Sequence, residues 1–234
     1  MGQIAETGIM VAAGKMKHID EYHFAQQLTP AQMDYAWAQG WRHFGIYFFR
    51  YAKIQTRQGL SHVTPLRIDL AAFSLSTSQK RVSKKNQDLV IKIRDAFIDE
   101  AKEALFDRHK TRFTENVPNS IHDFFSPYPA EIPCVTKEIC LFQNDELIAA
   151  SFLDLGQNSA SSVYAIYEPA AAKRSLGVYL ILLSLEYSRQ HHKRYYYPGY
   201  AYREPSHYDY KKKFTGIESY DWSDWKTAAQ LKED

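Results

Sequence analysis

The chain has 234 residues, a formal net charge of +2, 45% hydrophobic residues and 15% aromatic residues. This composition excludes a disordered, low-complexity or collagen-like chain, and the length suffices for one large domain or two small ones. The longest strongly apolar stretch, residues 178–185, is far below the roughly 20 residues that cross a bilayer. The near-zero net charge does not by itself indicate a nucleic-acid partner, so local charge has to decide that question.

The first half of the chain is predicted to mix helices and strands. Thr29-Pro30-Ala31-Gln32 combines a capping hydroxyl, a proline at the first helical position and a glutamine three residues after the cap, which is typical of a helix start. That helix is expected to end near Gly40. Residues 46–49 and 66–70 read as strands, and residues 98–112 carry apolar side chains at helical spacing.

Four prolines mark a loop-rich joint at residues 113–133. This joint separates a predicted N-terminal unit, residues 1–112, from a C-terminal unit, residues 134–234. In the C-terminal unit the apolar pattern predicts strands, a helix and a final strand. They comprise a hairpin over residues 139–142 and 147–155, a strand over 162–167, a helix over 176–190 and a strand over 195–197.

The two cysteines, Cys134 and Cys140, fit neither a disulfide framework nor the spacing of a zinc site. We therefore expect reduced thiols, as in a cytoplasmic protein. The opening residues lack the basic region of a secretory signal. No motif indicates a metal centre or a covalent nucleophile, and we expect no membrane partner.

Two segments concentrate positive charge. Residues 78–94 carry six Lys or Arg against one acid, and residues 189–213 carry seven against two, in a region dense with tyrosine. Basic segments interleaved with aromatic side chains suit a protein that grips a phosphate backbone and stacks bases, although most basic runs are solvated faces. The start of the predicted helix at residues 173–177, with Lys173 and Arg174, is a candidate anion site, or else an ordinary helix start capped by Ser175.

Several sequence words, in their order along the chain, resemble the arginyl-tRNA-protein transferases and their bacterial leucyl-transferring relatives. The resemblance spans roughly residues 33–220. The words are Gly40-Trp41-Arg42-His43-Phe44-Gly45, Phe49-Arg50-Tyr51, Pro65-Leu66-Arg67-Ile68, Ser161-Ser162-Val163-Tyr164, Arg174-Ser175-Leu176-Gly177 and Tyr196-Tyr197-Pro198-Gly199-Tyr200. It implies an α+β, GNAT-like acyltransferase fold, in which a mixed sheet is flanked by helices and the N-terminal half packs against a C-terminal GNAT-like domain.

The resemblance also implies an activity: transfer of Arg or Leu from charged tRNA to the N-terminal α-amine of an acceptor protein beginning with Asp or Glu, which marks that protein for degradation. The partners would be aminoacyl-tRNA and the acceptor's N-terminal segment, with no DNA. Because the ester is already activated, alignment of the amine and stabilisation of the oxyanion are the main demands. No cofactor is expected.

The residue roles that the resemblance implies fall into three groups. Asp154 is expected to assist the amine, with Ser162 and Tyr164 shaping the cleft, although Asp154 could equally be a turn residue. The tRNA-binding residues are expected to be Arg174, Ser175, Gly177, Lys80, Arg81, Lys84, Lys85 and Lys211. The acceptor-binding residues are expected to be Arg42, Arg50, Arg67, Tyr197 and Tyr200, although each arginine could instead form a structural ion pair.

Two departures from the family pattern qualify this hypothesis. No cysteine precedes Cys134, so the iron–sulfur or metal site associated with the family's N-terminal cysteines is not expected. The family's Cys-x-Lys-Met stretch reads Pro205-Ser206-His207-Tyr208 here, which leaves the acceptor and the donor open. The alternatives are a GNAT enzyme that uses acyl-CoA, a tRNA-dependent peptide ligase, and a tRNA-binding relative without activity.

Overall fold

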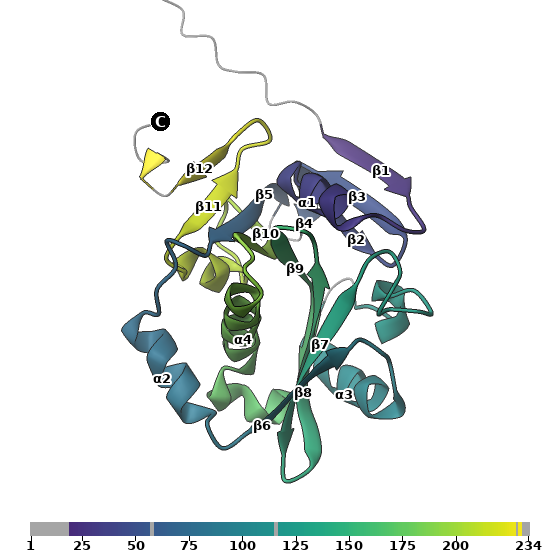
Figure 1. Cartoon of the computed structure of the whole chain (residues 1–234), viewed down its shortest axis with the longest axis vertical. Coiled ribbons are helices and arrows are strands. Elements are labelled where there is room, and N and C mark those ends of the chain that lie inside the picture. The colour runs from purple at the N-terminus through teal and green to yellow at the C-terminus, as the bar shows by residue number, and fades with distance from the viewer. Residues whose placement is uncertain (1–18, 57–58, 115–116, 228, 231–234) are drawn as a thin grey trace, which may run out of the picture.

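A computed structural model describes residues 19–56, 59–114, 117–227 and 229–230 (Figure 1). These residues form a large nine-stranded sheet and a smaller three-stranded sheet. Within the described part of the chain, no helix is long and apolar enough to cross a membrane. The predicted α+β class, a mixed sheet flanked by helices, is confirmed.

The large sheet has the strand order β12-β11-β5-β10-β9-β8-β7-β6, and β4 pairs with β5 beside this path. All of its pairings are antiparallel except that of β9 with β10. The strands are β4 (Lys53–Thr56), β5 (Gly59–Asp69), β6 (Val90–Asp95), β7 (Thr136–Gln143), β8 (Glu146–Leu155), β9 (Ser159–Tyr167), β10 (Tyr195–Tyr202), β11 (Ile217–Tyr220) and β12 (Trp225–Thr227).

Helices cover both faces of this sheet (Figure 1). Helix α4 (Leu176–Gln190) and the more peripheral α2 (Thr77–Lys85) lie on one side, while α3 (Glu100–Lys110) and the 3-10 turn η1 (Ile121–Phe124) lie on the other. Helix α4 is buried through residues such as Leu180, Leu182 and Leu185, so it forms the main hydrophobic layer on its side. Two further 3-10 turns are η2 (Pro169–Arg174), which leads into α4, and η3 (Asp209–Lys213).

The small sheet has the order β1-β3-β2, with β1 (Asp20–Phe24), β2 (Arg42–Phe44) and β3 (Tyr47–Tyr51) all antiparallel. Helix α1 (Pro30–Ala38) precedes β2 and begins with the predicted capping box between Thr29 and Gln32. One face of the sheet is buried through Phe48, which packs in a cluster with Met33 and Trp37 of α1. Helix α1 and this sheet therefore form one packed unit.

Most predicted elements are present, but the sheet does not divide at the predicted joint. Strands β5 and β6 come from the predicted N-terminal unit and pair with β10 and β7 of the predicted C-terminal unit. The basic segment contains helix α2, which begins at a Ser76 capping box that the sequence analysis did not use. Strands β1, β2, β4, β6, β11 and β12 were not predicted, because each is short or lies at a sheet edge.

Strands β9 and β10 pair only at their beginnings. The parallel register runs from Tyr195 opposite Ser159 to Tyr197 opposite Ser161, whereas the pairing of β10 with β5 on its other edge starts at Tyr195 and continues to Tyr202. Strand β9 also has one residue more than β8 between Ser162 and Ala165, which is a β-bulge. The two strands thus separate at the point where the bulge turns side chains of β9 outward.

Candidate functional site

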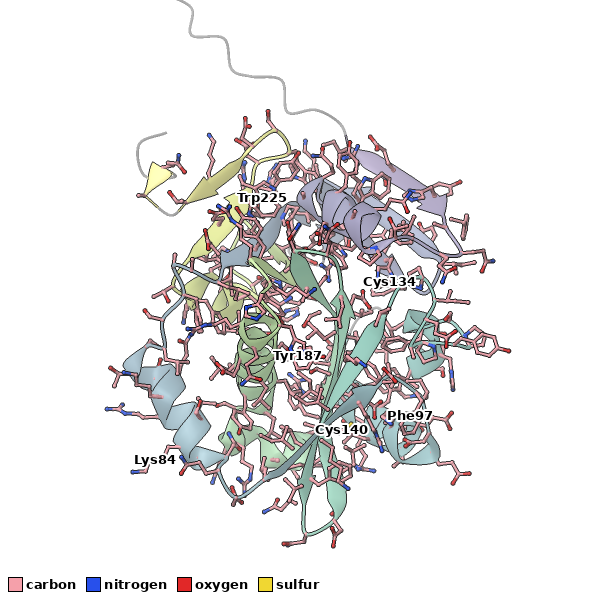
Figure 2. All side chains as sticks on the ribbon, in the orientation of Figure 1. Lys84, Phe97, Cys134, Cys140, Tyr187 and Trp225 are labelled. Carbon is pink, nitrogen blue, oxygen red and sulfur yellow. The ribbon has the colours of Figure 1, made fainter. Side chains whose placement is uncertain are left out.

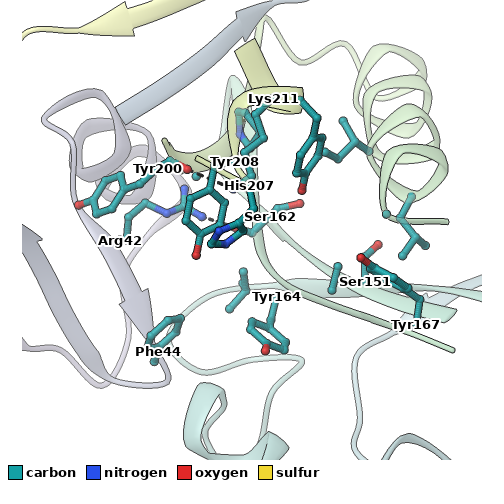
Figure 3. A pocket seen from close by; sticks show the side chains of 18 of the residues that line it. Arg42, Phe44, Ser151, Ser162, Tyr164, Tyr167, Tyr200, His207, Tyr208 and Lys211 are labelled. Carbon is teal, nitrogen blue, oxygen red and sulfur yellow. Dashed lines mark hydrogen bonds between the residues drawn. The ribbon is translucent and has the colours of Figure 1, made fainter. Parts of the chain in front are cut away.

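A cavity of about 340 Å³ lies where β9 and β10 separate. The first part of η3 and the loop before it lie over the cavity, and the start of α4 and the small sheet contribute to its walls (Figure 3). Its lining includes Arg42, Phe44, Phe49, Tyr51, Arg112, Ser151, Ser162, Val163, Tyr164, Ala165, Tyr167, Gly177, Leu180, Ile181, Tyr200, Tyr202, His207, Tyr208, Tyr210 and Lys211. No Asp or Glu is among the described residues that line it.

One end of the cavity is cationic (Figure 3). A Cβ atom added at Gly199 would lie 3.4 Å from Nζ of Lys211 and 3.9 Å from Nη2 of Arg42, so the two cations flank the same point of β10. Gly199 has a φ of +98°, a conformation that favours glycine. The turn of β10 at this residue therefore lets both side chains approach the strand.

Hydrogen bonds fix these two cations in place. Nη1 of Arg42 donates to Oγ of Ser161 at 2.6 Å, and Nη2 donates to the carbonyl of Ser162. Nζ of Lys211 donates to the carbonyl of Tyr200 at 3.2 Å. Burial, and then the charge of Arg42, lower the pKa of Lys211 to about 7. Burial also lowers the pKa of Arg42. Asp154, behind the wall, partly opposes this effect on Arg42, and no Asp or Glu among the described residues lines the cavity itself.

Phenol groups surround the middle of the cavity. The Tyr164 ring stacks on Phe124 with centroids 3.8 Å apart, and the Tyr200 hydroxyl donates to the carbonyl of Gly40 at 2.6 Å. Burial raises the pKa of Tyr164, Tyr200 and Tyr208. These phenols are therefore neutral hydrogen-bond donors near neutral pH.

The other end of the cavity is mostly apolar. Helix α4 contributes Leu180 and Ile181, and β9 contributes Ala165. Ser151 of β8 also faces this region, and its buried hydroxyl has no hydrogen-bond partner among the described groups. Near this end the guanidinium of Arg112 lies over the Tyr167 ring, 4.4 Å from its centroid. The cavity thus offers distinct environments at its two ends.

The structure places Asp154 behind the cavity lining, which differs from its predicted role beside the amine. Its side chain is 1% exposed, and both carboxylate oxygens are engaged. Oδ2 lies 2.6 Å from Nε2 of His43, and Oδ1 accepts a hydrogen bond from Oγ1 of Thr136 at 2.6 Å. His43 itself reaches the cavity wall. Asp154 therefore acts on the site through His43 and β2, which also carries Arg42.

Most of the cavity lining lies in a part of the chain that is similar to a known protein family. The sequence profile described as "Arginine-tRNA-protein transferase, C terminus" matches residues 101–221, which include β7 to β10, α4 and most of the cavity lining. The chain belongs to the arginine-tRNA-protein transferase family. The predicted family and the predicted transferase activity are confirmed.

Relatives of this transferase match along most of its length. It is 28% identical over 208 residues to the aspartate/glutamate leucyltransferase of Helicobacter hepaticus, covering 86% of this chain and 83% of the relative. It is 31% identical over 174 residues to the enzyme of the same name from Saccharophagus degradans, covering 70% of each chain. Among solved structures, a putative GNAT-family acetyltransferase from Novosphingobium aromaticivorans is similar with a TM-score of 0.42, at 11% identity over 72% of this chain and 63% of that one.

The metal or iron–sulfur site associated with this family does not fit the residues of this transferase. An iron–sulfur cluster takes about four cysteine ligands, and the chain has two cysteines. The described residues that come closest to a metal site are His43, Cys134 and Asp154, whose ligand atoms lie within 4.8 Å of one another. The Asp154 carboxylate is already used by His43 and Thr136, and burial raises the pKa of Cys134 well above its usual range. The Asp154 carboxylate thus already has hydrogen-bond partners, and the Cys134 thiol stays protonated, so this group of side chains does not fit a metal site.

Six of the predicted residues line the cavity: Ser162, Tyr164, Gly177, Lys211, Arg42 and Tyr200. Three predicted acceptor-binding residues do not. Arg50 pairs with Glu21 at 2.7 Å on the opposite face of β3, and Arg67 pairs with Glu218 at 2.5 Å. Tyr197 is buried beside Trp37 in a separate apolar cluster. For Arg50 and Arg67, the structure shows the ion-pair alternative that the sequence left open.

The predicted anion loop is built differently from the expectation. Arg174 forms a two-point contact with Asp88, at 2.9 and 2.8 Å, and this contact ties η2 to the turn between α2 and β6. Ser175 has a φ of 55° and its side chain makes no capping hydrogen bond to α4. Of this loop, only Gly177 lines the cavity, beneath the Tyr167 ring.

The basic side chains of α2 lie on the surface. Lys80, Arg81, Lys84 and Lys85 are all exposed, and Figure 2 shows Lys84 pointing away from the body of the protein. Nζ of Lys85 donates to the carbonyl of Lys173 at 2.7 Å. This contact joins the end of α2 to the loop before α4.

Several cavity residues were missed by the sequence analysis. Phe49 and Tyr51 lie on either side of Arg50, which was the residue predicted to bind the acceptor. Side chains alternate along a strand, so the two aromatic rings lie on the face opposite Arg50, and that face lines the cavity. Arg112 follows the end of α3, and no sequence signal distinguished it. Three further cavity residues lie in the tyrosine-rich segment: Tyr202, Tyr208 and Tyr210. The abundance of tyrosine there does not by itself tell cavity residues from core residues.

Proposed function

We propose that this transferase moves leucine from leucyl-tRNA to the α-amine of a polypeptide that begins with Asp or Glu. The proposal rests on one observation: the cavity has a cationic end and an apolar end, with no carboxylate among its described lining residues. The names of the relatives from Helicobacter hepaticus and Saccharophagus degradans agree with this choice of donor and acceptor.

The cationic end supports an acidic acceptor residue. Arg42 and Lys211 flank one point of β10, and no Asp or Glu is among the described residues that line the cavity. A carboxylate that enters there loses its water, but it gains charge-assisted hydrogen bonds from Arg42 and Lys211. An uncharged amide of the same shape would give neither cation a negative partner inside the cavity. We therefore assign the acceptor's side-chain carboxylate to Arg42 and Lys211.

The apolar end supports leucine rather than arginine as the donor residue. Leu180, Ile181 and Ala165 offer apolar surface to a branched aliphatic side chain. A guanidinium group would find no carboxylate partner there, and it would lie near the positive charge of Arg112. The donor's side chain is therefore assigned to this end.

The reaction needs little chemistry from the protein. The aminoacyl ester is activated, and an N-terminal amine with a pKa of about 7.7 to 8.0 is partly neutral near neutral pH. The amine attacks the ester carbonyl and forms the amide bond, the bond to the 3′ oxygen breaks, and the proton lost by the amine ends on that oxygen, which leaves as the free tRNA hydroxyl. We propose that neutral phenols such as Tyr164 and Tyr208 donate hydrogen bonds to the developing oxyanion, together with the hydroxyl of Ser162, which lies 2.7 Å from the Tyr196 hydroxyl. No metal or iron–sulfur cluster is required for these steps.

The basic surface of α2 is the proposed tRNA contact. Lys80, Arg81 and Lys84 are exposed, and phosphate contacts of this kind supply most of the salt-dependent affinity for nucleic acid. We further propose that the reaction takes place in the cytoplasm, where charged tRNA is made, and that the added leucine marks the acceptor for degradation.

A transfer assay tests the proposal. Radiolabelled leucyl-tRNA and arginyl-tRNA are offered separately with peptides that begin with Asp, Glu or Asn, and acetyl-CoA serves as a parallel donor. We expect label from leucyl-tRNA on the Asp and Glu peptides, and at least tenfold less on the Asn peptide, because a charge-assisted hydrogen bond contributes about 1.5–3 kcal/mol. The variant Arg42→Gln should reduce the preference for Asp over Asn. Transfer from arginyl-tRNA alone, or from acetyl-CoA alone, would overturn the proposal.

A further inference from the structure

One face of the small sheet is aromatic and open to solvent. Tyr22 of β1 lies opposite Phe49 of β3, and Phe24 lies opposite Tyr47. Residues directly opposite in an antiparallel pair share a face. The Tyr47 ring contacts the rings of Tyr22, Phe24 and Phe49, with centroids 5.8, 5.4 and 5.8 Å away. Tyr22 is 68% exposed, Phe24 65% and Tyr47 38%. We call these three residues the aromatic ladder.

The aromatic ladder runs directly into the cavity. Phe49 and Tyr51 continue it along β3, and both line the cavity. Their rings meet Tyr200 at centroid distances of 6.4 and 5.5 Å. Arg42 of β2 lies opposite Phe49 in the register, so it stands on the same face of the sheet. A chain that leaves the cationic end of the cavity over this sheet therefore passes onto the ladder.

The charges around the aromatic ladder argue against a nucleic-acid occupant. On this face of the three strands the only basic residue is Arg42, at the cavity, and Asp20 of β1 is acidic. The basic helix α2 lies at the other end of the molecule from β1 (Figure 1). A polyanion is attracted to the α2 side, which leaves the aromatic side, with its single basic residue at the cavity, to a polypeptide.

We propose that the aromatic ladder binds the acceptor polypeptide just after its N-terminal residue, as an extended segment with apolar side chains. This inference rests on the proposed function, since it takes Arg42 as the position of the acceptor's first side chain. Tyr22 lies two strands away from Arg42, a distance of about 10 Å at the usual strand spacing, or roughly three residues of extended chain. The ladder thus selects apolar side chains around the third to fifth positions of the acceptor.

The test uses a double variant, Tyr22→Ser with Phe24→Ser, in the full chain. Both side chains are exposed, so their removal leaves the core intact. Fluorescence anisotropy measures the Kd of three acceptors without tRNA: an Asp-Ala dipeptide, an eight-residue Asp peptide with Leu at positions 3 to 5, and the same peptide with Ser there. Transfer from leucyl-tRNA to the three acceptors is measured in parallel. Tyr35→Ser is the matched control, because Tyr35 is 70% exposed on α1, outside the ladder.

We expect the double variant to weaken binding of the Leu-containing peptide about tenfold, as removal of exposed aromatic anchors does. The dipeptide, the Ser-containing peptide and the KM for leucyl-tRNA should stay unchanged, and Tyr35→Ser should change none of them. An equal loss for all three acceptors, a raised KM for leucyl-tRNA, or a change from dimer to monomer in sedimentation would overturn the inference. If the wild-type protein binds the Leu-containing peptide through the ladder but transfers nothing to any acceptor, the inference stands and the proposed function fails.

Discussion

Nε2 of His43 lies 2.6 Å from Oδ2 of Asp154, and this contact joins β2 to β8 beneath the cavity. The other side of the imidazole is fixed as well, since Nδ1 lies 2.9 Å from the carbonyl of Gly45. The residue before His43 is Arg42, which lies at the cationic end of the cavity. Asp154 therefore positions the strand that presents Arg42.

The variant Asp154→Asn should affect stability more than transfer. It replaces a buried carboxylate that holds His43 and Thr136, so the free energy of unfolding in urea should fall by about 1–3 kcal/mol. The transfer rate per folded molecule should fall by less than about tenfold, because the carboxylate does not reach the cavity. Thr136→Val, which leaves the His43 contact in place and removes the Oδ1 contact together with a longer, 3.3 Å hydrogen bond to the Cys134 carbonyl, is the control and should lose about 1 kcal/mol. A hundredfold slower transfer with unchanged stability would show that the carboxylate takes part in the reaction.

The local elements could be predicted because their signals are local. The capping box of α1 and the hairpin turn between β7 and β8, where Asn144 and Asp145 adopt positive φ, are fixed by residues within one or two turns of chain. The predicted site residues were less successful where the answer depended on long-range pairing. Arg67 faces Glu218 across 151 positions of sequence, and no local pattern shows that this arginine is already neutralised.

The pairing of strands from both halves of the chain in one sheet could not be predicted from the sequence for a similar reason. Strand β5 pairs with β10 and β11, and β6 pairs with β7, so the large sheet is assembled from segments on both sides of the proline-rich stretch. Prolines at residues 118–133 indicate irregular backbone, which is a local property. They do not indicate whether the strands on either side join one sheet.

Lys211 should give acceptor binding a distinctive pH dependence. Its pKa in the free protein is about 7, lowered by burial and by Arg42, so it is charged below pH 7 and loses its charge above it. A bound carboxylate favours the charged form and raises that pKa. The KM for an Asp peptide should therefore be constant below pH 7 and rise above it, by at most about tenfold per pH unit.

The variant Lys211→Arg isolates this effect, because arginine stays charged throughout the range. The KM of this variant for the same Asp peptide should lack the part of the rise above pH 7 that comes from Lys211. The titration of the peptide's own amine affects the KM of both proteins equally. A peptide that begins with Asn should show no such rise with the wild-type protein. Identical pH profiles for wild type and Lys211→Arg would mean that Lys211 does not contact the acceptor's carboxylate.

The basic face of α2 should account for more of the salt dependence of tRNA binding than Arg174 does. Lys80 and Lys84 are exposed and lie one helical turn apart. Arg174 is held by Asp88, and this contact also lowers the pKa of Asp88. In filter binding, removing Lys80 and Lys84 together should reduce the slope of log affinity against log salt by about 1 to 2. Arg174→Ala should leave the slope nearly constant.

Asp88→Asn is the matched control, since it frees the Arg174 guanidinium without adding a basic residue. If Arg174 can reach the tRNA only when it is released, this variant should steepen the salt dependence slightly. The opposite result would be a smaller salt-dependence slope in Arg174→Ala and an unchanged slope when Lys80 and Lys84 are removed. It would show that the tRNA contacts the loop before α4 rather than α2.

The two cysteines should be dispensable for transfer. Burial raises the pKa of Cys140 to about 12, and burial also raises that of Cys134, while metals bind the thiolate rather than the thiol. A variant with Cys134→Ala and Cys140→Ala should therefore keep the wild-type transfer rate below its melting temperature. It should lose stability, since both side chains are in the core, and its Tm should fall by several degrees. Wild-type protein treated with a chelator is the control and should transfer at an unchanged rate. Stoichiometric iron or zinc in the purified protein, together with loss of transfer after chelation, would contradict a reaction carried by Arg42, Lys211 and the phenols alone.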